Sequence, residues 1–233
     1  MHRKSLVMLL TVVCVGWLSL GSQTATNATT PVADQGTNQT ASQGTVPPQA
    51  KPPEPLPASA LESLKQKAVA GDVAAQTKLG ELYALGQGVA RNLQQSAKWF
   101  RKAAEQGDAS AQLKIGVMYV GGFGVISDVQ EGIRWYKKAA AQGSVDAMLQ
   151  LGNLYEAGHG VPKSGAEALN WYLKAAEKGN VDAELKAGYI LINGLEGVPP
   201  DHQQALKWFS KAAEKGSGEG EHIFDTPLRP PLQ

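Results

Sequence analysis

The chain contains 233 residues, a length that suits one or two ordinary domains. Its 22 basic and 21 acidic side chains nearly cancel, and residues 59–216 alone contain 18 basic and 16 acidic ones. This balance argues against nucleic acid or another phosphate-rich partner, which needs a positive surface. The single cysteine, Cys14, lies in an apolar run near the N-terminus, so the rest of the chain has no disulfide and no cysteine-ligated metal.

Residues 1–21 have the pattern of a secretory signal peptide. Arg3 and Lys4 precede an apolar run of 15 residues, 6–20, and small and polar residues follow it. The run is shorter than the roughly 20 residues of a membrane-spanning helix. We therefore expect cleavage after Gly21 or a few residues later, export to the periplasm or the medium, and no membrane span in the mature chain.

Two alternatives for this segment are a membrane anchor and a lipoprotein signal. Without cleavage, the apolar run would hold the chain in the membrane. In a lipoprotein, Cys14 would carry the lipid, but Val13 stands where a small residue usually precedes such a cysteine. Cys14 also comes early in the run, so the cleaved signal fits the pattern better than either alternative.

Residues 22–57 are predicted to form a tether rich in Thr, Gln, Asn, Ser, Ala and Pro. Seven of the 13 prolines lie between Pro31 and Pro57, and apolar periodicity is absent. Such a composition buries too little apolar surface to offset the conformational entropy lost on ordering. Asn27 and Asn38 match the N-glycosylation pattern, which matters only in a eukaryotic secretory pathway.

The chain after the tether repeats itself with a period of about 36 residues. The repeat glycines are Gly71, Gly107, Gly143 and Gly179, each 36 residues apart, and then Gly216 after 37. Four tryptophans keep the same spacing: Trp99, Trp135, Trp171 and Trp208. A period of this length without strand-like alternation predicts two helices per repeat, which we name helix A and helix B.

Helix A is predicted to begin after a capping residue that directly follows each repeat glycine. These caps are Asp72, Asp108, Ser144 and Asn180. In the first copy, Ala75, Leu79, Gly80 and Tyr83 share one helix face. The small Ala and Gly on that face allow a neighbouring helix to approach closely. Gly86 is then expected to end the helix in the left-handed conformation.

Helix B is predicted to begin at a second set of capping residues. These are Asn92, Asp128, Ser164 and Asp201. A Glu or Gln stands three residues after each cap, which predicts a reciprocal capping box. Trp99 and Ala103 are four residues apart, so the indole is expected on the stripe that faces helix A.

The array is predicted to extend beyond its four full copies. Ser59 is expected to cap a leading half-repeat, in which Leu64 takes the tryptophan position, and Ser217 a stunted helix at the other end. The fourth repeat carries one extra loop residue. The predicted boundaries are 1–21 for the signal, 22–57 for the tether, 58–216 for the array, with full repeats at 71–106, 107–142, 143–178 and 179–215, and 217–233 for a short tail.

These motifs resemble the Sel-one-like repeat family, a relative of the tetratricopeptide repeats. The shared pattern is Ala-x-x-x-Leu-Gly-x-x-Tyr-x-x-Gly-x-Gly-Val and then Ala-x-x-Trp-x-x-Lys-Ala-Ala-x-x-Gly, over about residues 59–216. The resemblance implies an all-α fold, a right-handed α-solenoid, and a role as an adaptor in assemblies. Many bacterial members are exported, and some act in host contact. Cysteine-rich relatives are linked to penicillin binding, which is not expected here because these repeats lack cysteine.

The sequence contains no constellation that predicts catalysis, a cofactor or a metal site. His159 and His202 have no second histidine or carboxylate cluster at ligand spacing. Four lysines recur in phase, and their stems are expected to cover the tryptophans while their charges stay in water. These are Lys102, Lys138, Lys174 and Lys211. The recurring tyrosines, Tyr83, Tyr119 and Tyr155, are expected to pack in the core.

A partner surface is predicted on the concave side, which helix A lines in such solenoids. The in-phase positions that vary there, here called the helix A row, are Lys78, Glu81, Lys114, Val117, Gln150, Asn153, Lys186 and Tyr189. An extended peptide or a partner helix would fit such a groove. The predicted partner is therefore a protein or peptide.

The predicted function is an exported, non-enzymatic adaptor or scaffold of the bacterial cell envelope. One alternative is a protein or enzyme that acts on cell-wall ligands with penicillin-binding-like activity. The other is a secreted virulence factor that binds a host protein. The repeat signature explains the fold and does not separate these three.

Overall fold

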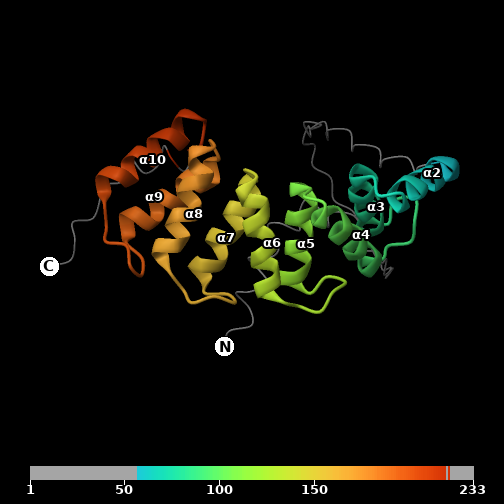
Figure 1. Cartoon of the computed structure of the whole chain (residues 1–233). Helices are drawn as coiled ribbons and strands as arrows, with labels where there is room; N and C mark the ends of the chain where they lie inside the picture. The colour runs from blue at the N-terminus through green and yellow to red at the C-terminus, as the bar shows by residue number, and fades with distance from the viewer. Residues whose placement is uncertain (1–56, 219, 221–233) are drawn as a thin grey trace, which may run out of the picture. The chain divides into compact units, whose positions relative to one another are not determined.

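The computed structural model describes residues 57–218 and 220, so the predicted signal, nearly all of the tether and most of the tail lie outside the described residues. The described part contains nine α-helices and no sheet (Figure 1). They are α2 (Ala58–Val69), α3 (Val73–Leu85), α4 (Leu93–Glu105), α5 (Ala109–Gly121), α6 (Val129–Ala141), α7 (Val145–Ala157), α8 (Gly165–Glu177), α9 (Val181–Asn193) and α10 (His202–Glu214).

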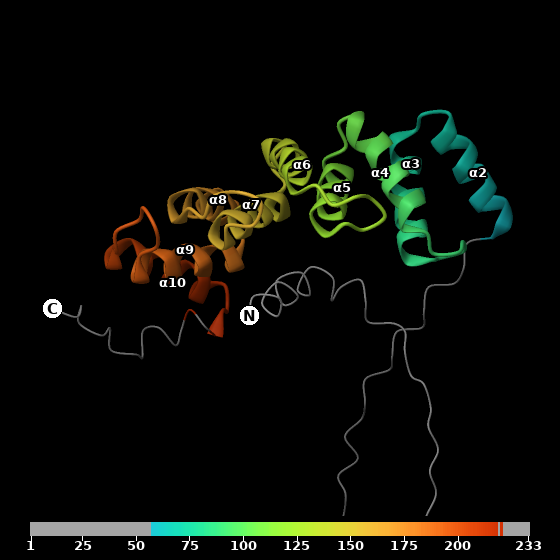
Figure 2. The same cartoon turned by 90° about the horizontal axis from the view of Figure 1, so that it is seen from below.

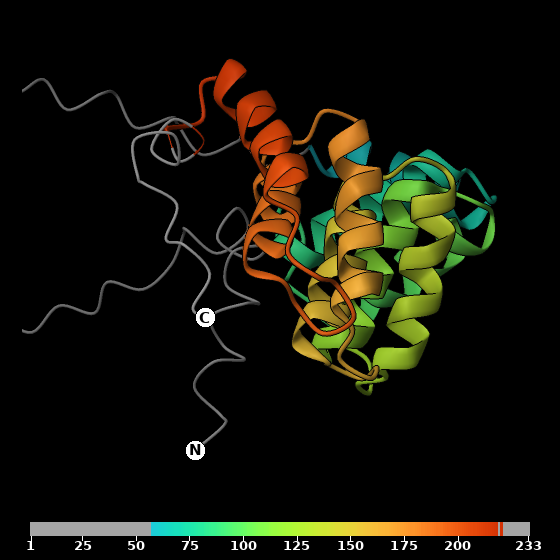
Figure 3. The ribbon, with the colours of Figure 1, turned by 90° about the vertical axis from the view of Figure 1, so that its left-hand side faces the viewer.

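Each helix packs against the helix before it and the helix after it in the chain. Figure 2 shows these pairs following one another in a curved row, and in Figure 3 the row recedes behind α10. In the repeats, α3, α5, α7 and α9 are the A helices, and α4, α6, α8 and α10 are the B helices. The predicted all-α solenoid is therefore confirmed. None of the described helices is long and apolar enough to cross a membrane.

The helix caps predicted for the full repeats are confirmed. Asp72 Oδ1 accepts a hydrogen bond of 2.7 Å from the Ala75 N–H, and Asn92 Oδ1 accepts one of 2.9 Å from Gln95. The other six caps make the same bond to the residue three positions on. Gly86 ends α3 with φ 72°, in the left-handed conformation that favours glycine.

The prediction that Ser59 caps the leading half-repeat was wrong. Helix α2 begins at Ala58 after Pro57, and no side chain caps it. Pro57 precedes the helix with ψ 141°, and its carbonyl accepts the first helical hydrogen bond, from the Leu61 N–H at 3.0 Å. At the other end, Ser217 Oγ accepts a hydrogen bond of 3.3 Å from the Gly220 N–H, as a cap there would.

The predicted reciprocal half of the capping box was also wrong. The Asn92 N–H donates to Tyr83 O at 2.8 Å, so the Gln95 side chain is not needed to satisfy it. The loop returns the start of helix B to the end of helix A, and this contact recurs in every repeat. The equivalent donors and acceptors are Asp128 to Tyr119 at 3.0 Å, Ser164 to Tyr155 at 2.9 Å and Asp201 to Leu191 at 2.7 Å.

The extra residue of the fourth repeat leaves that contact intact. Leu195 and Val198 pair in an isolated bridge within the loop, with Leu195 N–H donating to Val198 O at 3.2 Å. The loop therefore takes up the additional residue in a local turn. As a result, α10 begins in the same relation to α9 as the earlier B helices have to their A helices.

An aromatic residue directly after each tryptophan packs helix B onto helix A. These residues are Phe100, Tyr136, Tyr172 and Phe209, and all are buried. A Cβ placed on Gly80 of α3 would lie 2.7 Å from the Phe100 ring, and one on Gly152 of α7 would lie 2.4 Å from the Tyr172 ring. The close approach predicted for these glycines is confirmed. The aromatic partner was not identified from the sequence, although it recurs in phase with the tryptophans.

The tryptophans pack on the helix A side, as predicted. Trp99 belongs to a buried cluster with Ala68 of α2 and with Ala75 and Leu79 of α3, and Leu64 packs against the same cluster. Further along the chain, Trp135 and Trp208 lie in the two following clusters. The core of the described part is therefore divided into three clusters that follow one another along the array, each formed by neighbouring repeats.

Candidate partner-binding surface

The helix A row lies two residues to a helix on α3, α5, α7 and α9. The first residue of each pair and the second are three positions apart, so they share one face of their helix. The four pairs have the same register in their helices because the repeat length from one capping residue to the next is constant. Whether this face binds a partner stays a prediction.

At the N-terminal end of the row, ionic contacts link two A helices. Glu81 accepts an ion pair of 3.5 Å from Lys78 on its own helix and one of 3.1 Å from Lys114 on α5. The Lys114 ammonium also lies 5.8 Å from the centre of the Phe100 ring. All three charged side chains keep part of their surface in solvent, so these pairs contribute little stability and remain available for exchange with a ligand.

At the C-terminal end, α7 and α9 are linked through Tyr172 of α8. The Tyr172 hydroxyl lies 2.7 Å from Asn153 Oδ1 and donates to Glu156 Oε2 at 2.6 Å. Lys186 of α9 pairs with Glu156 at 3.6 Å, and its ammonium lies 5.2 Å from the centre of the Tyr172 ring. Burial raises the pKa of Tyr172, and the neighbouring Glu156 carboxylate raises it further. The hydroxyl is therefore a neutral donor at physiological pH.

Glu156 was not among the predicted site residues. Its counterparts in the other A helices are Ala84, Val120 and Ile192. The sequence signal was a single carboxylate at a position that is otherwise apolar. Its role in linking α7 to α9 follows only from the structure, which places Lys186 beside it.

The remaining members of the row are less polar. Val117 is half-buried and packs against the core. Tyr189 is 42% exposed, and its ring meets that of Phe209 edge to face with centroids 5.2 Å apart. Gln150 is half-buried on α7. Along the row, the surface therefore changes from paired charges on α3 and α5 to an exposed aromatic ring on α9.

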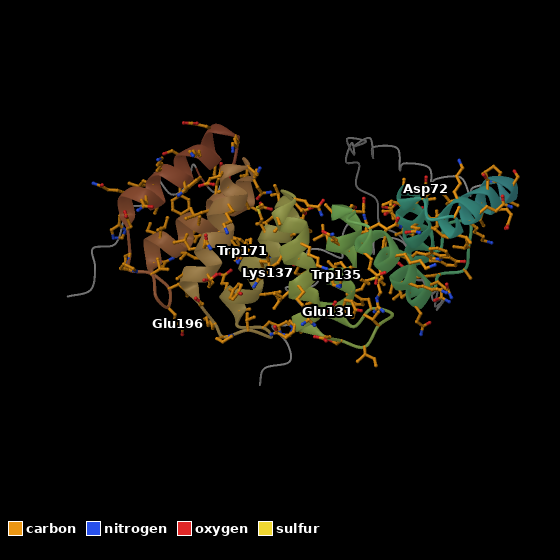
Figure 4. The ribbon with its side chains drawn as sticks, in the orientation of Figure 1. Asp72, Glu131, Trp135, Lys137, Trp171 and Glu196 are labelled. Atoms are coloured by element: carbon orange, nitrogen blue, oxygen red, sulfur yellow. The ribbon has the colours of Figure 1, made fainter. Side chains whose placement is uncertain are left out.

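The four in-phase lysines of the B helices lie over the tryptophans, as predicted, but the contact is made by their charged ends and not by their stems alone. Their ammonium groups lie 4.8, 4.1, 4.2 and 4.2 Å from the indole centres of Trp99, Trp135, Trp171 and Trp208. Figure 4 labels Trp135 of α6 and Trp171 of α8. Each contact is a cation–π interaction within one helix. The recurring lysines are thus part of the packing, and the three recurring tyrosines are half-buried against the core.

A set of side-chain contacts that the sequence did not reveal, here called the ladder, joins the A helices α3, α5 and α9 to the end of a helix B; in α7 the equivalent position is Met148. The Gln76 and Gln112 side chains are buried and donate to Ala68 O and Ala104 O at 3.0 and 3.2 Å. Gln106 donates to Gln76 Oε1 at 2.8 Å, and Gln142 does the same to Gln112. The paired glutamines are uncharged and lie 30 residues apart in the sequence. The periodicity of a single helix therefore could not predict their contact.

The same ladder position becomes an ion pair in the fourth repeat. Glu184 is 1% exposed, and its Oε1 accepts from the Lys215 ammonium at 2.6 Å. Lys215 also donates to Gly179 O at 3.1 Å, as Gln142 donates to Gly107 O at 2.9 Å in the second repeat. This pair is structural, because its carboxylate faces the interior of the repeat.

Among residues 57–218 and 220, no group of three or more His, Cys, Asp and Glu side chains is placed to hold a metal ion. The polar contacts that the helix A row makes are therefore hydrogen bonds and ion pairs. Such a surface can recognise a partner by charge, hydrogen bonding and aromatic contact.

The family model for the Sel1 repeat matches four consecutive stretches, residues 73–108, 109–144, 145–180 and 181–217. A solved Sel1 repeat protein from Oxalobacter formigenes is similar, with 37% identity and a TM-score of 0.65 over 71% of this chain and 68% of that one. No match was found among curated proteins.

A second solved structure is c5321, titled a protective antigen present in uropathogenic Escherichia coli strains and displaying an SLR fold. It shares 40% identity with a TM-score of 0.65 over 70% of this chain. The match spans only 35% of the Escherichia coli protein. Since the Sel1 model matches more than half of the sequence, and the matched stretches coincide with the helix pairs from α3 to α10, this chain belongs to the Sel1 repeat family.

Proposed function

We propose that this protein is an exported adaptor that binds a segment of another protein along the helix A row. The observation that carries the proposal is the recurrence of that row in the same register on four successive A helices. Glu81 joins α3 to α5 and Glu156, beside the row, joins α7 to α9 through ion pairs, so polar contacts link the A helices in two neighbouring pairs. A row that crosses several repeats suits an extended ligand better than a small molecule.

Differences between the repeats support the same proposal. Residues that build the fold recur in phase, whereas members of the row change from charge to amide to aromatic ring. In a repeat protein, positions outside the packing interfaces are those that can be adapted to a partner. Sel1 repeat proteins are typically protein-interaction scaffolds, and this chain belongs to that family.

The proposed location rests on residues 1–21 and on one relative. The signal-like pattern predicts export, and the similar Escherichia coli protein is described as a protective antigen. Cell fractionation and N-terminal sequencing of the purified chain test this: we expect a mature protein that begins near residue 22. An intact N-terminus in the cytoplasmic fraction would contradict it.

Site-specific photo-crosslinking tests the binding role. A benzophenone amino acid in place of Tyr189, which is exposed on α9, should form a discrete adduct with one protein in cells. The same group in place of Gln203, which is exposed on α10 and outside the row, is the matched control. Excess unlabelled wild-type protein should compete the Tyr189 adduct. Equal labelling from both positions would remove the evidence for a binding row.

The enzymatic alternative is tested separately. Purified mature protein is incubated with labelled penicillin and with peptidoglycan fragments. We expect no saturable turnover or covalent labelling, since the proposal assigns the protein a binding role only. Saturable turnover would overturn the adaptor proposal in favour of a cell-wall enzyme.

A further inference from the structure

An open surface lies at the junction of the first and second repeats, away from the helix A row. Two adjoining hollows of about 700 and 390 Å³ lie along α4 and the loop from α5 to α6, and Arg101 and Val125 line both. None of the eight residues of the helix A row lines either hollow. A ligand bound there would therefore leave the row free.

The loop side of this surface carries three aliphatic side chains beside the polar Ser127, Asp128 and Gln130. Ile126, at the loop, is 92% exposed, and Val125 and Val129 continue the lining beside it. A single exposed aliphatic residue needs no explanation by itself. Here, however, the residue borders a hollow, and the corresponding loop positions in the other repeats are Ala90, Pro162 and Pro199.

The α4 side is basic. Lys98, Arg101 and Lys102 line the smaller hollow, and none of the three forms an ion pair with any residue that the structure describes. Asp128, in the lining of the larger hollow, has one carboxylate oxygen engaged in capping α6, at 2.9 Å from the Glu131 N–H. Glu105 is the other carboxylate in the lining, so cations prevail.

Arg101 is held in position for a ligand. Its guanidinium lies 5.4 Å from the centre of the Tyr119 ring, and it donates a hydrogen bond to the Tyr119 hydroxyl. The hydrogen bond to Tyr119 holds one edge of the guanidinium, and its remaining N–H groups can form paired hydrogen bonds to a carboxylate.

The equivalent junction between the second and third repeats differs in each of these respects. Arg134, the counterpart of Lys98, is paired with Glu131 at 2.5 Å. Gln130 donates a hydrogen bond to Gly160 O across that junction, and Pro162 replaces the exposed isoleucine. Lys137, labelled in Figure 4, is the counterpart of Arg101. This junction is a natural control for the first.

We infer that the hollow at the first junction binds an extended peptide segment in which a carboxylate side chain lies next to an aliphatic one. The carboxylate would pair with Arg101, supported by Lys98, and the aliphatic side chain would pack on Val125 and Ile126. The charge of the α4 side selects an acidic ligand. The exposed isoleucine selects a peptide over a purely anionic polymer or a lipid headgroup, because neither would use an apolar contact at that place.

Peptide selection tests the inference with the full chain. A phage-displayed library of random dodecapeptides is panned against the wild-type protein, and enriched peptides are synthesised and titrated by fluorescence anisotropy. We expect enriched sequences with Asp or Glu beside Leu, Ile or Val. Replacing their acidic residues with the amides should weaken binding at least about tenfold, and raised salt should weaken it as well.

Variants assign the binding to this surface. Arg101→Glu and Ile126→Ser should each abolish or greatly weaken binding, whereas Lys137→Glu at the control junction should leave it within about twofold of wild type. Circular dichroism reports whether Arg101→Glu is folded. If it is not, Arg101→Gln replaces it in the binding measurements. Enrichment of peptides without acidic residues, equal binding by Arg101→Glu, or no enrichment at all would overturn the inference. So would binding of phosphatidylglycerol vesicles that depends on Arg101 and competes with the peptides.

The outcome is independent of the proposed binding along the helix A row. The Tyr189 crosslink does not involve Arg101 or Ile126. If both surfaces bind, the protein can hold two protein segments at once. If only the row binds, the inference fails and the adaptor proposal stands.

Discussion

At the scale of single residues, one position of the ladder is occupied by a glutamine pair in two repeats and by an ion pair in another. The first two repeats use a buried glutamine that accepts from another glutamine, and the fourth uses the buried carboxylate of Glu184 with Lys215. A buried charge is expensive unless it is paired and hydrogen-bonded. Glu184 Oε2 has no hydrogen-bond partner among the described residues, so much of its compensation comes from Lys215.

Lys215→Ala is therefore expected to destabilise the C-terminal end of the array by about 1–3 kcal/mol, because it leaves a carboxylate buried without its cation. The double substitution Glu184→Gln with Lys215→Gln copies the second repeat and should recover most of that loss. Urea unfolding followed by circular dichroism measures both. A double variant no more stable than Lys215→Ala would show that the two ladder pairs are not interchangeable.

At the scale of the helix, the features that the sequence predicted are those that depend on neighbours within a few residues. Asp72 and Asn92 cap their helices because a short polar side chain reaches the N–H three residues ahead. Contacts that depend on how the loop places helix B beside helix A were predicted wrongly or not at all. The Asn92 N–H is satisfied by Tyr83 O instead of Gln95, and this follows from packing of helix B on helix A.

For the candidate surface, the sequence identified positions but not contacts. Lys78 and Glu81 were identified because they occupy in-phase positions of helix A whose residue types differ between repeats. The pairing of Glu156 with Lys186 joins residues 30 positions apart in different repeats, and only the stacking of α7 and α9 brings them together. The two hollows beside Arg101 were not predicted, since they depend on an exposed side chain in a loop of the next repeat.

The packing of helix B on helix A gives a prediction at the scale of the element. Gly80→Ala should destabilise the array by about 1 kcal/mol or more, because a Cβ would lie 2.7 Å from the Phe100 ring and overpacking outweighs the helix propensity of alanine. In a Phe100→Leu background the same change should cost less, since the ring is gone. Thermal unfolding of the four proteins of this cycle measures the coupling.

Ala74 supplies the control for that prediction. It is exposed on the same helix, so Ala74→Gly reports the propensity difference without a packing contact and should cost roughly 1 kcal/mol. If Gly80→Ala stabilises the protein by the same amount, the close approach of the ring does not limit this position.

At the scale of the whole array, stability is expected to be a sum of terms within repeats and between neighbours. Each helix contacts mainly the one before and the one after it. In such a linear arrangement, loss of an inner contact uncouples the segments on both sides, whereas loss of a terminal contact frees only the end. The position of a substitution along the array therefore decides how many helices it destabilises.

Trp135→Ala and Trp208→Ala test this dependence on position. Both indoles are buried, at 6% and 9% exposure, so each truncation should cost about 3–5 kcal/mol at its own site. Trp135 lies on α6, in the middle of the array of helices, and its loss should lower amide protection in the helices on both sides. Trp208 lies on α10, so its loss should lower protection mainly in α9 and α10. Hydrogen exchange measured by mass spectrometry resolves the two cases.

Lys138→Met is the control for the inner site, because it removes the ammonium 4.1 Å from the Trp135 ring centre and keeps the indole. It should cost about 0.5–1 kcal/mol and leave the protection pattern unchanged. An equal spread of lost protection from Trp135→Ala and Trp208→Ala would mean that the array unfolds as one unit. Coupling between distant repeats would then exceed what contacts between neighbouring helices supply, and a ligand bound at one end could influence the other.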